Sequence, residues 1–303
     1  MENILLTGGF GFTGSHLINH LQKMNFQIIV FSNRNIVNPI ILDKSNIIFE
    51  SGDIRDSNRF HEVMKKYRPS YVIHLAALTG ITKCQNDPFT AFLTNVYGTY
   101  DVIKGCIETN SYLIFISSRE VYGETNNIES SEDDNKIPNN IYGMTKLEAE
   151  NLILWANKKY NLNYTILRPT NLYGHGGDTY GAQILIKKIL EEKDVEILGG
   201  KQRMNFIFVG DVIDSIIKVI NNDQSKNEIF NVGSNDTLSI LEFIELVTKL
   251  TNKKPLLKFL PMRNGETKNF HVSIEKIQKK LNWKPSTQIK DGLLKTINWY
   301  KNS

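Results

Sequence analysis

Tyr142 and Lys146 stand four residues apart in a segment with helical periodicity. On a helix this spacing puts a phenol and an ammonium on one face, so both can point into the same cleft. A tyrosine with an ordinary pKa of about 10 is a poor base at neutral pH, but a nearby ammonium favours the phenolate and lowers that pKa. Taken alone, the spacing is also typical of a solvated helix face.

Ser118 is a third residue that could take part in this chemistry. It leaves a strand-like run, residues 112–116, at the end where parallel strands line a ligand-binding crevice. Its hydroxyl is placed to hydrogen-bond a substrate hydroxyl or keto oxygen, although a serine can also simply close a strand. Together the three side chains predict acid–base chemistry at such an oxygen.

A glycine-rich loop occupies residues 8–14, between a strand-like run and a helical pattern. Its first glycine permits a tight turn, the second lets the backbone approach a phosphate, and the third lets the helix pack close to the strand. The helix N-terminus then offers N–H groups and its positive dipole end to a pyrophosphate. In this context the loop predicts dinucleotide binding. The residues expected at the dinucleotide are Gly8, Gly11, Phe12, Thr13 and Gly14.

The tip of the second strand bears on which dinucleotide binds. Many such strands end in an acid that accepts from the ribose 2′-hydroxyl, but here the tip carries Ser32, Asn33 and Arg34. The guanidinium of Arg34 matches a 2′-phosphate, which favours NADP over NAD unless Arg34 is an ordinary surface residue. Asp53 and Ile54, after the third strand, are expected near the adenine, although an aspartate there is also typical of a turn.

Short apolar runs alternate with longer amphipathic stretches over the first two-thirds of the chain. Such alternation requires crossover connections and therefore predicts an α/β fold, a doubly wound parallel sheet of Rossmann type with helices on both faces. The expected strands are residues 3–7, 27–31, 47–51, 71–75, 112–116 and 163–168, and the expected helices are 13–24, 57–67, 88–110 and 141–159.

After residue 168 the alternation of strand and helix patterns becomes less regular. This indicates a smaller lobe, from which the chain returns in places to the main sheet. Strand patterns occur at residues 206–209 and 228–232, and helical patterns at 212–221, 239–251 and 289–301. We expect a dinucleotide-binding domain over residues 1–172, with returns at about 203–233, and a mostly substrate-binding lobe over 173–303.

Composition excludes several other classes of protein. The 303 residues carry 36 Lys+Arg against 32 Asp+Glu, an excess too small to argue for a nucleic-acid partner. Cys84 and Cys106 are the only cysteines, which excludes a disulfide scaffold and a Cys-rich metal site. No apolar stretch approaches the roughly 20 residues that cross a bilayer, and the N-terminus lacks a leader pattern. We expect a cytoplasmic enzyme without a bound metal.

Several segments together resemble the extended short-chain dehydrogenase/reductase family, which comprises nucleotide-sugar epimerases, dehydratases, decarboxylases and reductases. They are residues 7–14, 74–77, 95–99, 117–123, 142–146, 167–174, 281–285 and 292–300. The resemblance implies that Tyr142 is the acid/base at a sugar hydroxyl, that Lys146 holds the nicotinamide ribose, and that Ser118 fixes the reacting oxygen. It also implies cofactor contacts, or support for them, from Leu75, Ala76, Ala77, Asn95 and Pro169.

The resemblance further implies where a nucleotide-diphosphate sugar lies. Asn171 is similar to a family residue that contacts the diphosphate, and Arg263 resembles an arginine that grips a phosphate. Family members often place another arginine where this chain has Met204; Arg203 is displaced by one residue, which in a strand turns it to the other face. The substrate residues expected are Leu78, Thr79, Arg119, Glu120, Asn171, Arg203 and Arg263. Members commonly dimerise through two helices, here residues 88–110 and 141–159.

The family's reactions pass through a 4-keto sugar, and the residues do not select one fate outright. An epimerase returns the hydride to the other face, a 4,6-dehydratase uses a second base to remove the C5 proton, and a reductase delivers hydride from NADPH to a preformed ketone. Glu120 resembles the dehydratase base, but its neighbour Arg119 stays charged and cannot protonate a leaving group. The Arg119–Glu120 pair could instead bind a polar or anionic sugar substituent, or form a structural salt bridge.

We favour an epimerase acting at sugar C4, because the overall pattern, including the short loop over residues 78–84, is most similar to epimerases. The second alternative is an NADPH-dependent reductase of a 4-keto nucleotide sugar, because the tip of the second strand resembles an NADP site. The third alternative is a 4,6-dehydratase. A non-catalytic NADP-binding protein is a further alternative, against which the intact Ser118, Tyr142 and Lys146 argue.

Overall fold

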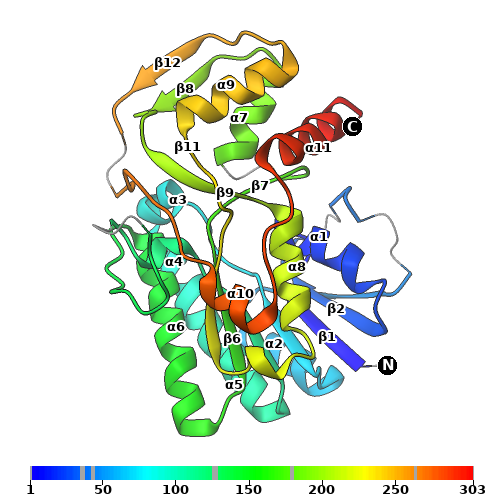
Figure 1. Cartoon of the computed structure of the whole chain (residues 1–303). Helices are drawn as coiled ribbons and strands as arrows, with labels where there is room; N and C mark the ends of the chain where they lie inside the picture. Colours follow the sequence, from blue (N-terminus) through cyan, green and yellow to red (C-terminus); the bar gives the residue numbers. More distant parts are fainter. Residues whose placement is uncertain are drawn as a thin grey trace.

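A seven-stranded parallel sheet forms the larger lobe of the computed structural model, which describes residues 2–34, 38–41, 45–124, 129–177, 181–262 and 265–302 (Figure 1). The strand order is β10-β6-β5-β4-β1-β2-β3, and every neighbouring pair is parallel. The strands are β1 (Glu2–Thr7), β2 (Phe26–Ser32), β3 (Ile47–Ser51), β4 (Tyr71–His74), β5 (Tyr112–Ile116), β6 (Tyr164–Pro169) and β10 (Glu228–Val232). The direction of winding reverses between β1 and β4, and ligands bind beyond the carboxyl ends of strands at such a switch point. The predicted Rossmann-type fold is confirmed.

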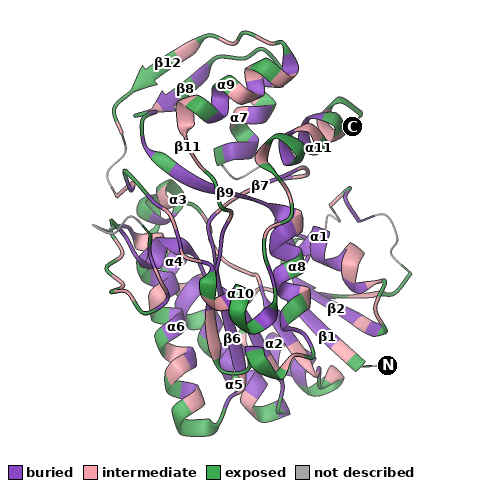
Figure 2. Cartoon of the chain, in the orientation of Figure 1, coloured by how far each residue is buried: buried purple, intermediate pink, exposed green. Residues whose placement is uncertain are grey.

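Helices cover both faces of this sheet. The helices α2 (Ser57–Tyr67), α5 (Gly98–Thr109) and α6 (Ile141–Tyr160) pack on one face, and α1 (Phe12–Leu21) and α8 (Val209–Val219) on the other. Within β1, Ile4 and Leu6 belong to the core shared with α1 and α8, whereas Leu5 faces α2 and α5, as strand alternation requires. Both faces are therefore apolar, and Figure 2 shows the strands of this sheet largely buried.

The segment expected to be one helix over residues 88–110 is divided into three. It consists of α4 (Pro88–Phe92), a wide π-helical turn η1 (Leu93–Tyr97), and α5. The turn directs Asn95 inward, where its side chain accepts from Leu78 N at 2.8 Å and donates to Thr145 Oγ1 at 3.0 Å. These tertiary hydrogen bonds explain an interruption that helical periodicity does not reveal.

The smaller lobe contains a three-stranded sheet of order β11-β9-β7 and a two-stranded sheet β12-β8. Its elements are β7 (Asn171–Tyr173), α7 (Gly181–Leu190), β8 (Val195–Leu198), β9 (Arg203–Phe208), β11 (Thr237–Ser239), α9 (Ile240–Thr251), β12 (Leu257–Leu260) and α11 (Ile289–Asn302). Between β9 and β11 the chain returns to the larger lobe through α8 and β10. The short elements α3 (Ile81–Asn86), η2 (Arg119–Val121), η3 (Asp223–Ser225) and α10 (Glu275–Leu281) complete the larger lobe.

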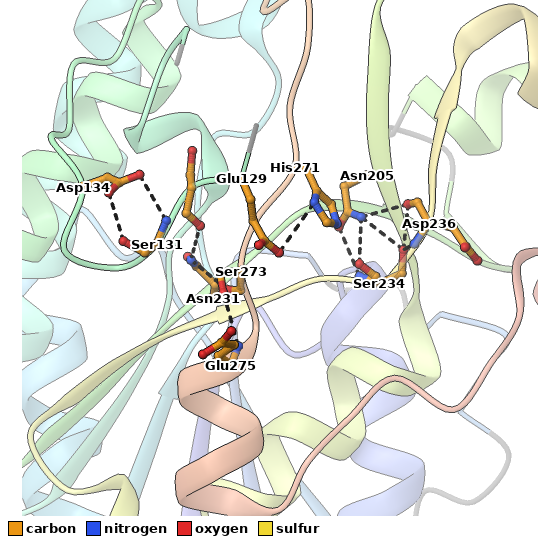
Figure 3. Close-up of polar contacts among 11 residues, drawn as sticks. Glu129, Ser131, Asp134, Asn205, Asn231, Ser234, Asp236, His271, Ser273 and Glu275 are labelled. Carbon is orange, nitrogen blue, oxygen red and sulfur yellow. Dashed lines mark hydrogen bonds and ion pairs between the residues drawn. The ribbon is translucent and has the colours of Figure 1, made fainter. Parts of the chain in front are cut away.

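Segments far apart in the sequence meet where the two lobes join (Figure 3). Ser130 N donates to His271 O at 2.9 Å and Ser273 N donates to Ser130 O at 2.8 Å, which makes a short parallel bridge. The Asn231 side chain, in β10, donates to the carbonyls of both Ser130 and Ser273. These bonds fix residues 268–273, which we call the seam segment, between the larger lobe and β9.

Across the described part of the chain, no helix combines the length and the apolar character that crossing a bilayer would require.

Candidate active site

A cavity of about 950 Å³ lies beyond the carboxyl ends of β1, β4, β5 and β6, between the two lobes. Its walls come from both lobes, because β9 and α7 contribute residues opposite the glycine loop. Most of the residues predicted from sequence line it: Gly8, Gly11, Phe12, Thr13, Gly14, Ser32, Asn33, Arg34, Asp53, Ile54, Leu75, Ala76, Ala77, Leu78, Thr79, Ser118, Arg119, Glu120, Tyr142, Lys146, Pro169 and Asn171.

The glycine loop leaves no room for side chains. Gly8 has a φ of +68°, and a Cβ there would come within 2.9 Å of the Ala76 backbone. A Cβ at Gly14 would lie 2.5 Å from Gly9 O, so α1 could not approach the loop as it does. The first turn of α1 carries no acidic side chain, so its N–H groups face the cavity without a competing carboxylate. This backbone cradle fits the pyrophosphate of a dinucleotide.

The end of β2 lies beside a carboxylate that comes from elsewhere in the chain. Asn33 Nδ2 donates to Asp53 Oδ2 at 3.3 Å, and Arg55 forms a two-point ion pair with the same carboxylate at 2.9 and 2.7 Å. Hydrogen bonds from Arg55 lower the pKa of Asp53 to about 2. Arg34 is exposed at the edge of the cavity. Arg55 thus neutralises Asp53, a pairing that the sequence pattern does not indicate.

Tyr142 and Lys146 lie on the first turns of α6, which begins where the Asn140 side chain accepts from Gly143 N at 2.8 Å. Lys146 is 3% exposed; its Nζ donates to Ile116 O at 2.8 Å and lies 4.7 Å from the centre of the Phe115 ring. Burial lowers the pKa of Lys146 to about 8, an effect that the Glu150 carboxylate opposes. The ammonium is thus held at the end of β5, by a carbonyl two residues before Ser118.

Ser118 is buried in extended backbone conformation, and its Oγ accepts from Glu120 N at 3.2 Å. That bond leaves the hydroxyl hydrogen available to donate into the cavity that Ser118, Tyr142 and Lys146 all line. A hydrogen-bond donor, a phenol and a buried ammonium in one cavity can bind an alcohol or ketone oxygen and exchange a proton with it.

A buried ion pair beneath this site fixes the helix that carries it. Arg168, in β6, reaches Glu150, in α6, through two hydrogen bonds of 3.0 and 2.6 Å, and Ser117 Oγ donates to the same carboxylate. Arg168 also donates to Tyr122 OH at 2.8 Å, and this hydroxyl donates to Asn231 in β10. The network sets the rotation of α6 relative to β5. Glu150 lies one helical turn after Lys146, and this spacing is the sequence signal by which Glu150 could have been recognised as part of the site.

Asn95 does not line the cavity. It holds the backbone of Leu78, which does line the cavity, so it supports the segment that follows β4. Thr7 also holds the segment that follows β4. Its Oγ1 accepts hydrogen bonds from Leu75 N and Ala76 N and is hydrogen-bonded to the buried ring of His74 at 2.6 Å. The lining side chains that sequence reasoning missed include Arg55, Lys83, Lys188, Gln202, Met204, Phe206 and Glu266.

The expected substrate contact of Arg203 needs correction. Its guanidinium points away from the cavity, to Glu242 at 3.0 Å and to the Thr237 carbonyl at 2.8 Å, and it is about half exposed. Met204 and Phe206 line the cavity instead, because alternate residues of β9 face opposite sides. The other arginine expected at a phosphate, Arg263, lies outside the described residues.

Residues 4–233 match the model of the NAD dependent epimerase/dehydratase family. The chain belongs to this family. A putative UDP-glucose 4-epimerase of Methanocaldococcus jannaschii is 31% identical, with 99% of each chain covered. The chain is also similar to the crystal structure of a UDP-glucose 4-epimerase from Thermotoga maritima with UDP-glucose, with a TM-score of 0.92, 28% identity and 99% of each chain covered.

A second solved structure is the UDP-glucuronic acid 4-epimerase of Bacillus cereus in complex with UDP-glucuronic acid and NAD, with a TM-score of 0.91, 28% identity and 99% of each chain covered. This epimerase/dehydratase family member is therefore an NAD-dependent nucleotide-sugar enzyme, as the resemblance implied.

Proposed function

We propose that this enzyme interconverts nucleotide-diphosphate hexoses that differ in configuration at C4. The observation that supports it most strongly is the buried Lys146 ammonium one turn from Tyr142, in the same cavity as Ser118 and the glycine cradle. When bound, the dinucleotide supplies the hydride acceptor and donor. Residues 8–14 would hold its pyrophosphate and Lys146 its nicotinamide ribose.

Tyr142 accepts the proton of the sugar 4-hydroxyl as the C4 hydrogen leaves as hydride. The Lys146 ammonium favours the phenolate electrostatically, which makes Tyr142 a competent base near neutral pH. Ser118 donates to the same oxygen and holds it in place as it becomes a carbonyl. After the sugar has turned, Tyr142 returns the proton to the oxygen, and the configuration at C4 is inverted.

The surroundings of Glu120 favour an epimerase over a 4,6-dehydratase. One carboxylate oxygen is bound by Arg119 Nη2 at 2.7 Å, and the other accepts from Asn140 Nδ2 at 2.8 Å. A base that removes the C5 proton needs an oxygen directed at that carbon, whereas each oxygen of Glu120 is oriented by a hydrogen bond to a neighbouring side chain. The adjacent acid that a dehydratase uses is replaced by Arg119, which cannot donate a proton.

We also propose that NADP is the preferred dinucleotide, with NAD accepted. The cavity edge at β2 presents Ser32, Asn33 and Arg34, and the carboxylate that Asn33 bonds, Asp53, is neutralised by Arg55. A 2′-phosphate would thus meet a guanidinium rather than an uncompensated acid. A preference for NADPH is the observation that would favour a 4-keto-sugar reductase as the second candidate.

The substrate nucleotide is proposed to be uridine diphosphate, because the similar structures contain UDP-glucose and UDP-glucuronic acid. We propose a homodimer that forms through α4, α5 and α6. These helices expose large apolar side chains that a partner helix pair would cover. They include Phe89 and Phe92 in α4, Tyr100 in α5 and Trp155 in α6, and Tyr97 in the intervening turn η1 is exposed beside them.

The test is incubation with UDP-, GDP-, CDP- and dTDP-hexoses, each with NAD⁺, NADP⁺ or NADPH, followed by NMR of the products. We expect the wild-type enzyme to form a C4 epimer from a UDP-hexose and Tyr142→Phe to show no turnover. Both the wild type and Tyr142→Phe should bind the dinucleotide. Tyr71→Phe is the matched control, because Tyr71 begins β4, at the end of the strand away from the cavity, and its OH bonds Asn221 there. Unchanged turnover by Tyr142→Phe would remove the proposed mechanism.

A further inference from the structure

Arg119 lines the cavity next to Ser118 but is only 4% exposed. Its Nη2 bonds Glu120 at 2.7 Å and lies 3.7 Å from Met204 Sδ. Its Nη1 is buried and, within the described parts of the chain, has no hydrogen-bond partner. A buried N–H group without an acceptor is costly, so a group that enters the cavity is the natural source of one.

The seam segment keeps this guanidinium from turning elsewhere. Phe270, in the middle of the segment, places its ring centre 4.6 Å from the guanidinium carbon, with Met204 close to Nη2. Phe270 is itself fixed, because its N–H donates to Arg203 O at 3.0 Å and Arg203 N donates to Lys268 O at 2.9 Å. The bridge of Val272 to Ser130 and that of Asn269 to Arg203 hold the segment between the larger lobe and β9.

The charge around Nη1 selects the kind of acceptor. The guanidinium charge is already compensated by Glu120, whose other oxygen accepts from Asn140. Met204 occupies the neighbouring wall, and Arg203 is turned outward to Glu242. A carboxylate at Nη1 would therefore share one guanidinium with a second anion, whereas a hydroxyl or carbonyl oxygen would not.

We infer that Arg119 determines sugar specificity by donating from Nη1 to a neutral oxygen of the hexose, and that its pairing with Glu120 disfavours a sugar that carries a carboxylate. The inference rests on the proposed function, since it requires a nucleotide sugar beside Ser118. It assigns Glu120 a role in setting the charge of this subsite rather than in proton abstraction.

The experiment measures affinities by calorimetry with saturating NAD⁺, in a Tyr142→Phe background so that no sugar is converted. The probes are UDP-glucose, UDP-glucuronic acid and UDP. We expect UDP-glucose to bind at least about 10-fold more tightly than UDP-glucuronic acid. Arg119→Met should weaken UDP-glucose by about 10- to 100-fold, the range for a hydrogen bond to a charged group, and leave UDP unchanged.

Glu120→Gln provides the sharper test, because it leaves the Arg119 charge uncompensated. It should move the preference toward UDP-glucuronic acid by at least about 10-fold. Arg203→Gln, which removes an arginine whose ion pair lies outside the cavity, is the matched control and should change none of the three affinities. Thermal unfolding checks that each variant folds. If Arg119→Met does not fold, Arg119→Lys is used in its place.

Three outcomes overturn parts of this account in distinguishable ways. An unchanged UDP-glucose affinity in the Arg119 variant overturns the contact, and an unchanged preference in Glu120→Gln overturns the charge selection. If NAD⁺ binds but no UDP-sugar does, the proposed function fails and this inference fails with it.

Discussion

The burial of Lys146 beside the cavity leads to a prediction about the stability of the fold. Burial lowers the pKa of its ammonium from an ordinary 10.5 to about 8. One unit of pKa corresponds to about 1.4 kcal/mol, so holding this charge in the folded protein at neutral pH costs roughly 3 kcal/mol. The residue is 3% exposed, so solvent does little to reduce the cost. A group placed for chemistry therefore weakens the fold around it.

Replacing Lys146 with methionine should remove this cost. At pH 6.5 the variant gains roughly 3 kcal/mol and loses about 1 to 3 kcal/mol because the Ile116 carbonyl is left unpaired. Between pH 8 and 10.5 the unfolded wild-type chain binds more protons than the folded one, so wild-type stability rises with pH. The variant has no such group. Its stability relative to wild type should thus fall by about 2 kcal/mol between pH 6.5 and 9.5.

The assay is urea unfolding of both proteins without dinucleotide at pH 6.5, 7.5, 8.5 and 9.5, followed by circular dichroism and tryptophan fluorescence. The pH dependence is the informative quantity, because contact terms that do not titrate cancel in it. Lys249→Met, at an exposed position of α9, is the control with the same substitution and no burial. A difference between wild type and Lys146→Met that is constant across this pH range would refute the reasoning.

Three further variants test other parts of the structure. Arg34→Ala should weaken NADP by about 10- to 100-fold and leave NAD unchanged in fluorescence titrations; equal losses for both would contradict the 2′-phosphate contact. Glu150→Gln should lower the free energy of unfolding by about 3 to 5 kcal/mol, because it leaves the Arg168 charge buried alone; a cost under 1 kcal/mol would show that the pair does not hold α6. Trp155→Glu, on the exposed face of α6, should convert a dimer to a monomer in light scattering with unfolding nearly unchanged. A dimer that persists would place the interface elsewhere.

The larger lobe could be predicted well because its strands are mostly buried runs of four to seven residues between long amphipathic helices. The bounds of β3, β5 and β10 agree with the expected ones, and α2 agrees at both ends. The smaller lobe was harder, since β7, β8, β11 and β12 have only three or four residues and show no measurable period. The π-helical turn η1 depends on bonds from Asn95 to distant groups, which periodicity does not report.

The candidate site divides in the same way. Local spacing placed Tyr142 and Lys146 in one cavity, and strand alternation explained why Arg203 faces out and Met204 in. Specific ion pairs were not predictable. That of Asp53 with Arg55 depends on the conformation of the loop after β3, and that of Glu150 with Arg168 depends on how α6 packs on β6. The neutralised carboxylate beside β2 and the ion pair beneath α6 therefore emerged only from the structure.

The central claim is that hydride leaves and returns to the same sugar carbon while Tyr142 carries the proton. The most direct test uses UDP-glucose deuterated at C4 in ordinary water, with NMR of the epimerised product. The account predicts that deuterium stays at C4 of the product and that Tyr142→Phe forms none. Deuterium lost to water, or found at another carbon, would contradict it.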